Sequence, residues 1–166
     1  MYSNRVFYVL AFLEGAIVMA MELLCGKMLT IYFGNSLIVW TPVLAVTLSG
    51  LTTGYFLGGI ISEKSKNTDA LFSLFFLALI FTGFIPYLSD VFLNMSTNLG
   101  YINGAVISSL LLLTPPLICM GATTPLIINN VTKSVVNSGK ATGWVYSVST
   151  AGGILSTFII GFYLMP

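Results

Sequence analysis

Long apolar runs alternate with short polar segments along the whole chain. Each run is close to the roughly 20 residues that a helix needs to cross the hydrocarbon core of a bilayer. The pattern therefore predicts an all-α protein, a polytopic transmembrane helix bundle of about five helices. The expected helices cover approximately residues 7–24, 40–61, 70–88, 101–128 and 141–164. Together they form one transmembrane domain over residues 1–166, with no soluble domain.

The fourth run is predicted to be irregular, because Pro115 and Pro116 lie in its middle. Proline removes a backbone donor and disfavours helical conformation at the residue before it. We expect one long helix broken at this pair, with freed carbonyls turned into the bundle. Irregular backbone at membrane depth has to be buried in protein or face water. Two separate half-helices are the alternative.

Small residues recur every four positions in the second and fifth runs. In lipid, this spacing lets two helices approach closely. We expect these positions to form packing faces, although glycine that is merely tolerated is the alternative. The predicted packing residues are Gly50, Gly54, Gly58, Gly153 and Gly161. The third run, rich in Phe and Leu, is expected to face lipid.

Two acids, Glu14 and Glu22, interrupt the first run. A carboxylate at that depth costs roughly 2.5–3.5 kcal/mol on insertion scales, so it is expected to face protein, water or a cation. The two lie about 80° apart around the helix and about 12 Å apart along it. Tyr55 and Tyr146 are candidates for cation–π contacts with a bound cation. The alternative is structural: Glu22 pairs with Lys27, or caps backbone groups bared in the fourth run.

The composition excludes several functional classes. The chain is 57% hydrophobic and 7% charged, against about 25% charged residues in soluble domains. Its net charge is only +1 and its basic residues lie in loops, so nucleic-acid binding is not expected. Without histidine, and with Cys25 and Cys119 in or beside apolar runs, neither a metal site nor a cofactor is predicted. Catalysis by this chain alone is not expected.

The distribution of basic residues predicts the orientation, because cytoplasmic loops are enriched in Lys and Arg. With five helices and a cytoplasmic N-terminus, the outer segments hold only Lys27. The inner segments hold Arg5, Lys64, Lys66, Lys133 and Lys140. We therefore expect the N-terminus inside, the C-terminus outside, and an integral membrane protein of the bacterial inner (plasma) membrane.

Several stretches, in order, resemble one family, the membrane-embedded relatives of spermidine synthase. Residues 50–59 read GxxxGYxxGG and residues 143–166 read GxxYxxSTxGxxxxTFxxGFxLxP. The other matching positions are Gly15, Glu22, Lys27, Tyr32, Phe33, Gly34, Trp40, Pro116, Gly121 and Pro125. Lys27 departs from the family, whose members carry arginine at this position. The chain also matches only the N-terminal transmembrane domain of the family.

The resemblance implies a membrane domain or subunit that anchors or serves polyamine (aminopropyl transfer) chemistry carried by another domain or chain. Two carboxylates along one helix would then pair with ammonium groups of a polyamine. A transporter-like bundle for small molecules or cations is one alternative, and a structural subunit of a larger membrane complex is another. The expected partners are the lipid bilayer, other membrane or membrane-associated chains, and a polyamine, but no nucleic acid.

Overall fold

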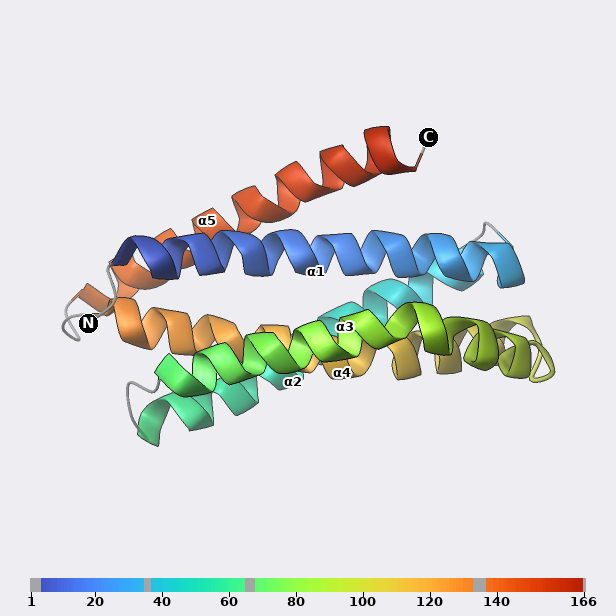
Figure 1. Cartoon of the computed structure of the whole chain (residues 1–166), viewed down its shortest axis with the longest axis horizontal. Coiled ribbons are helices and arrows are strands. Elements are labelled where there is room, and N and C mark those ends of the chain that lie inside the picture. The colour runs from blue at the N-terminus through green and yellow to red at the C-terminus, as the bar shows by residue number, and fades with distance from the viewer. Residues whose placement is uncertain (1–3, 35–36, 65–67, 133–136, 166) are drawn as a thin grey trace.

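Five long α-helices make up the described part of the chain (Figure 1). The structure is a computed structural model that describes residues 4–34, 37–64, 68–132 and 137–165. The helices are α1 (Asn4–Phe33), α2 (Leu37–Lys64), α3 (Thr68–Thr97), α4 (Tyr101–Val131) and α5 (Ser138–Ile159), which runs on into the π-helical turn η2 (Ile160–Leu164). All five are long and apolar enough to cross a membrane. The all-α prediction is confirmed, and the chain is an integral membrane protein.

The helices extend beyond their predicted ends. α1 continues to Phe33 rather than ending near residue 24, and α3 continues to Thr97 rather than ending near residue 88. The polar residues there contain no helix breaker, so hydrogen bonding continues past the apolar run. α1 ends where Gly34 adopts a φ of 81° and its N–H donates to the Thr30 carbonyl at 3.0 Å. That left-handed C-terminal cap favours glycine.

The expected break in the fourth helix is absent. α4 is one α-helix from Tyr101 to Val131, although Pro115, Pro116 and Pro125 all lie inside it. Each proline forfeits a backbone hydrogen bond, but α4 contacts each of the other four helices. Pro116 is buried in these contacts. Packing on every side therefore holds the helix through positions that would otherwise end it.

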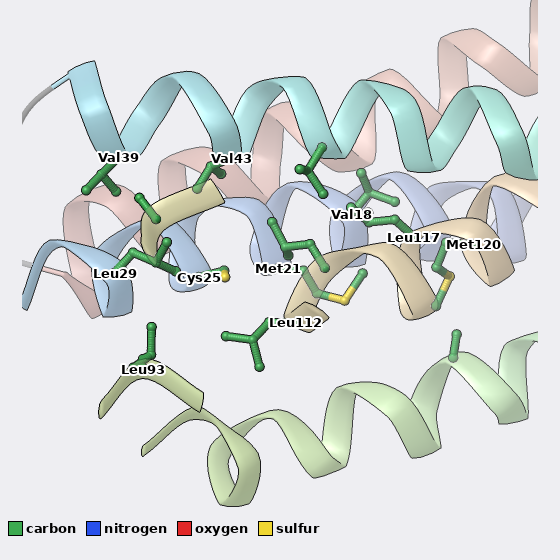
Figure 2. Packing of buried hydrophobic residues seen from close by; sticks show 14 of the residues in the cluster. Val18, Met21, Cys25, Leu29, Val39, Val43, Leu93, Leu112, Leu117 and Met120 are labelled. Carbon is green, nitrogen blue, oxygen red and sulfur yellow. The ribbon is translucent and has the colours of Figure 1, made fainter. Parts of the chain in front are cut away.

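The interior consists of two apolar clusters. The larger one joins α1, α2, α3 and α4, and Figure 2 shows Met21, Val43, Leu93 and Leu117 converging within it. The smaller one brings Phe7, Leu71, Leu126 and Val145 together beside the N-terminal part of α1. Cys25 and Cys119 are buried free thiols. α3 has the least buried of the five candidate spans, which fits the lipid-facing position predicted for it.

The glycine stripe of α2 faces α4. A Cβ on Gly54 would lie 2.5 Å from the Ile118 carbonyl oxygen and 2.8 Å from the Gly121 Cα. A Cβ on Gly50 would lie 2.9 Å from the Leu117 Cβ. Gly58 similarly lies against the backbone of Ala122. The two backbones thus approach as closely as the four-residue spacing predicts.

α5 approaches α1 through a different pair of glycines. Gly152 faces the Phe12 carbonyl, and a Cβ on Gly153 would lie 2.9 Å from the Met19 Cγ. Gly161 was expected to pack as well, but nothing lies within 4 Å of where its Cβ would be, so that expectation is wrong. The reason is visible in Figure 1, where the C-terminal half of α5 leaves the side of α1.

Candidate functional site

Glu14 is the polar centre of the bundle. It lies on α1 and is only 3% exposed. The Thr124 hydroxyl of α4 donates to its Oε1 at 3.1 Å, and the Ser149 hydroxyl of α5 donates to its Oε2 at 2.6 Å. Each carboxyl oxygen therefore has a donor from a different helix. Burial with partners on both oxygens is the condition under which a polar group is tolerated inside a protein.

Close contact between α1 and α5 places Ser149 within reach of Glu14. Gly15, next to Glu14 in the sequence, has the Ser149 backbone carbonyl where its Cβ would be. Any larger residue at position 15 would push α5 away. Serine is short, so its hydroxyl meets a carboxylate only when the two helix backbones nearly touch. The glycine therefore sets the distance that the hydrogen bond requires.

Thr124 and Ser149 differ from most hydroxyl residues of the bundle. The hydroxyls of Thr47, Ser109 and Thr157 each donate to the carbonyl four residues earlier in their own helix, as isolated Ser and Thr commonly do in helices. Those of Thr124 and Ser149 donate across to α1 instead. Sequence reasoning gave neither residue this role, because nothing local distinguishes them from the other Ser and Thr residues.

A cleft of about 480 Å³ opens beside Glu14, between α1, α2 and α5. Apart from Glu14, Tyr55 and three hydroxyl residues of α5, its lining is glycine or apolar. The lining residues are Glu14, Gly15, Val18, Met19, Leu51, Tyr55, Ser149, Thr150, Gly153, Ile154, Thr157 and Phe158. Among them, Glu14 is the single carboxyl residue, and none is Lys or Arg. The site is therefore an apolar cleft with one carboxyl group in its wall.

Two tyrosines join α2 to α5 at this cleft. The ring of Tyr55 meets the ring of Tyr146 edge to face, with centroids 6.5 Å apart and planes at 84°. Tyr55 lines the cleft and lies close enough to Glu14 to interact with it electrostatically. Tyr146 contacts Tyr55, is not among the described residues that line the cleft, and is 43% exposed. The fold thus brings together three of the four predicted ligand-binding residues.

Glu22, the fourth, faces a different neighbour. It lies beside the Thr47 hydroxyl of α2 and is not among the described residues that line the cleft. Measured along α1, Glu14 is about 7 Å before the middle of the helix and Glu22 about 5 Å after it, at a rise of about 1.5 Å per residue. The two acids are therefore similarly far from the middle of α1, on opposite sides of it, but they turn to different helices.

The suggested pairing of Glu22 with Lys27 is wrong. Lys27 is exposed, and no ion pair joins it to Glu22 in the described part of the chain. Five residues correspond to about 140° around a helix, so the two side chains leave α1 in different directions. Pairs that meet along a helix are three or four residues apart.

No protein-family model, curated protein or solved structure matches the chain. Within the described residues, no group of three or more His, Cys, Asp or Glu could hold a metal ion. The chemistry that the site offers is therefore that of one buried carboxyl, two hydroxyl donors and a neighbouring aromatic pair.

Proposed function

We propose that this protein is a membrane domain or subunit that binds a cationic amine in the cleft beside Glu14. The ligand class we propose is the polyamines, in service of aminopropyl-transfer chemistry carried by another domain or chain. Its membrane would be the bacterial inner membrane, with the N-terminus in the cytoplasm. The observation that carries the proposal is the buried Glu14 carboxyl in the wall of a 480 Å³ cleft whose lining includes no other acidic residue and no Lys or Arg.

An ammonium group suits this arrangement chemically. It has three donors and no acceptor, and a charge-assisted hydrogen bond to a carboxylate is roughly twice as strong as a neutral one. Thr124 and Ser149 each occupy one lone-pair direction of Glu14 and leave the others free. Tyr55 places an aromatic ring in the wall of the same cleft, and the face of such a ring attracts a cation. An ammonium group at Glu14 would thus be held by the charge of the carboxylate and by the neighbouring Tyr55 ring.

The remainder of the ligand would lie along apolar walls. Leu51 of α2 and Ile154 and Phe158 of α5 also line the cleft. Methylene segments of an aliphatic amine would bury against these side chains. Because Glu22 lies outside the cleft, one ammonium group would bind inside it, and any other ammonium group of the ligand would remain outside. This revises the expectation of two carboxylates holding one polyamine.

Calorimetric titration with spermidine tests the proposal directly. The protein would be reconstituted in nanodiscs of uncharged phosphatidylcholine, because anionic lipids bind polyamines themselves. We expect saturable binding that weakens at least about 100-fold in Glu14→Gln, since removing one partner of a buried ion pair costs about 3–5 kcal/mol. Glu22→Gln is the matched control and should bind as the wild type does. Absence of saturable binding, or equal affinity in Glu14→Gln, would overturn the proposal.

The same cleft is compatible with the transporter-like alternative. Flux measurements on liposomes loaded with spermidine would distinguish transport from binding alone. Movement of spermidine across the bilayer that Glu14→Gln abolishes would favour transport. Binding without movement would favour a domain that holds its ligand for a partner. Both outcomes keep Glu14 as the residue that recognises the amine.

A structural-subunit role has one observation in its favour. Besides the glycines that meet α1, α5 carries a stripe of small residues spaced four positions apart. All four residues of this stripe are exposed and face away from α1. They are Gly139, Gly143, Ser147 and Ala151. Small residues at this spacing are typical of helix contacts in membranes. Co-purification of a second membrane chain from native membranes, lost on Gly143→Leu, would support this role.

A further inference from the structure

We propose that Glu14 is protonated when the cleft is empty and gives up that proton when an ammonium group binds. The inference rests on the proposed function and adds an activity to it, the one-for-one exchange of a proton for an amine. It follows from the burial of Glu14, from the charges that the cleft lacks, and from the hydroxyl groups that contact the carboxyl.

An ionised Glu14 would have no compensating cation in the empty cleft. The group is 3% exposed, and none of the cleft-lining residues is Lys or Arg. Transferring an isolated carboxylate into an apolar interior is so unfavourable that such a group neutralises itself instead. Two hydroxyl donors offset part of this cost, but they supply no charge. The neutral acid is therefore the stable form until a cation arrives.

The two hydroxyls are suited to both protonation states. A protonated carboxyl has one O–H to donate and can still accept, whereas a carboxylate only accepts. A serine or threonine hydroxyl both donates and accepts, so Ser149 at 2.6 Å and Thr124 at 3.1 Å can adjust to either form by rotating a hydrogen. The heavy atoms need not move. A lysine or a backbone N–H in the same place would favour the carboxylate alone.

No other group near Glu14 would exchange a proton near neutral pH. From α2 the titratable neighbour is Tyr55, whose ring contacts that of Tyr146 of α5. Phenols ionise near pH 10 in water. From α4 and α5 the neighbours that contact the carboxyl are Thr124 and Ser149, which do not titrate in this range. Within the described residues, one proton is therefore available for each amine.

The exchange balances in atoms and charge. An ammonium ligand and the neutral Glu14 acid become an ammonium–carboxylate pair, and the acid proton passes to water. The only bond broken is the O–H bond of Glu14, and the contents of the cleft are neutral before and after. Amine affinity should then rise by about tenfold per pH unit while Glu14 remains protonated in the empty protein. A proton gradient across the membrane would thus bias on which side the amine binds and on which side it is released.

Calorimetry in two buffers measures the exchange. The wild type would be titrated with spermidine in phosphate and in HEPES, at one pH at which the amines of the ligand are fully protonated. The difference between the two apparent enthalpies, divided by the difference between the ionisation enthalpies of the two buffers, gives the number of protons exchanged. We expect about one per spermidine in the wild type and in Glu22→Gln. In Glu14→Gln, any remaining binding should release none.

The outcomes separate this inference from the proposed function. Binding by the wild type without proton release would overturn the exchange and leave amine binding intact. Proton release that persists in Glu14→Gln would assign the proton to another group, and this too would overturn the exchange at Glu14. No binding by the wild type would overturn both proposals. A further check is the pH dependence of the affinity, which should flatten in Glu14→Gln.

Discussion

The Ser149 hydroxyl lies 2.6 Å from Oε2 of Glu14, and the bond joins residues 135 positions apart in the chain. It ties α5 to α1 near the middle of the bundle. About one turn later, after Gly152 and Gly153 have packed against α1, α5 turns away, and Phe158, Phe162 and Tyr163 are exposed. The bond thus belongs to the last close contact of α5 with α1, beside the cleft between α1, α2 and α5.

Removing this hydroxyl should destabilise the bundle. We expect Ser149→Ala to lower the free energy of unfolding by about 1–2 kcal/mol, the range for interhelical hydrogen bonds in model membrane helices. Ser49→Ala is the matched control, because Ser49 is exposed and donates to the Ala45 carbonyl of its own helix. Thermal or denaturant unfolding in detergent measures both. Equal stability of the two variants would show that the Glu14 contact contributes nothing.

Overfilling the α2–α4 contact should have a larger effect. Gly54→Leu places four carbons where the Ile118 carbonyl and the Gly121 Cα already lie, and overpacking typically costs about 1–3 kcal/mol. Gly59→Leu is the matched control, since nothing lies within 4 Å of its Cβ position. Leucine is also the better helix former, so the control should melt at the same temperature or higher. A similar fall in both would point to a general intolerance of leucine in α2.

The contact between α1 and α5 should control ligand affinity as well as stability. Gly152→Leu would push α5 from the Phe12 carbonyl and carry Ser149 away from Glu14. We expect a lower melting temperature together with weaker spermidine binding. Gly161→Leu changes the same helix at a position with no neighbour within 4 Å and should alter neither. Wild-type affinity in a correctly folded Gly152→Leu protein would show that the cleft does not need this contact.

Lys27 should make no contribution to stability through Glu22. Because no ion pair joins them in the described residues, Lys27→Met should leave the melting temperature in detergent unchanged. In a double-mutant cycle, Glu22→Gln and Lys27→Met should add within about 0.5 kcal/mol. A larger coupling energy would show that the two side chains meet in the membrane.

The orientation can be tested by labelling single cysteines in intact cells, after the two native cysteines have been replaced. Asp69 and Asn98 are both exposed, at opposite ends of α3. If the N-terminus is cytoplasmic, a membrane-impermeant maleimide should label position 98 and should reach position 69 only after lysis. The reverse pattern would invert the proposed topology without changing the fold.

Most of the architecture follows from local sequence, for a reason peculiar to membranes. A segment in lipid has to satisfy its own backbone hydrogen bonds, so a long apolar run is constrained to form a helix. The five spans and the close approach of α2 at Gly54 could therefore be predicted from hydropathy and spacing. The helix ends could not, because the polar residues after each predicted end suggest loops, yet both segments, 26–33 and 90–97, lack proline and continue as helix.

The sequence by itself also determined that Glu14 needs a polar partner, since the cost of burying a carboxyl depends on the residue and its depth. Only the tertiary structure decided which partner it has. Whether Thr124, Ser149 or neither reaches it depends on the rotation and separation of three helices, and the Gly15 contact sets the separation of two of them, α1 and α5. The same rotation turns Glu22 toward Thr47 and away from the cleft. Such pairings are properties of helices in contact, and no single stretch of sequence encodes them.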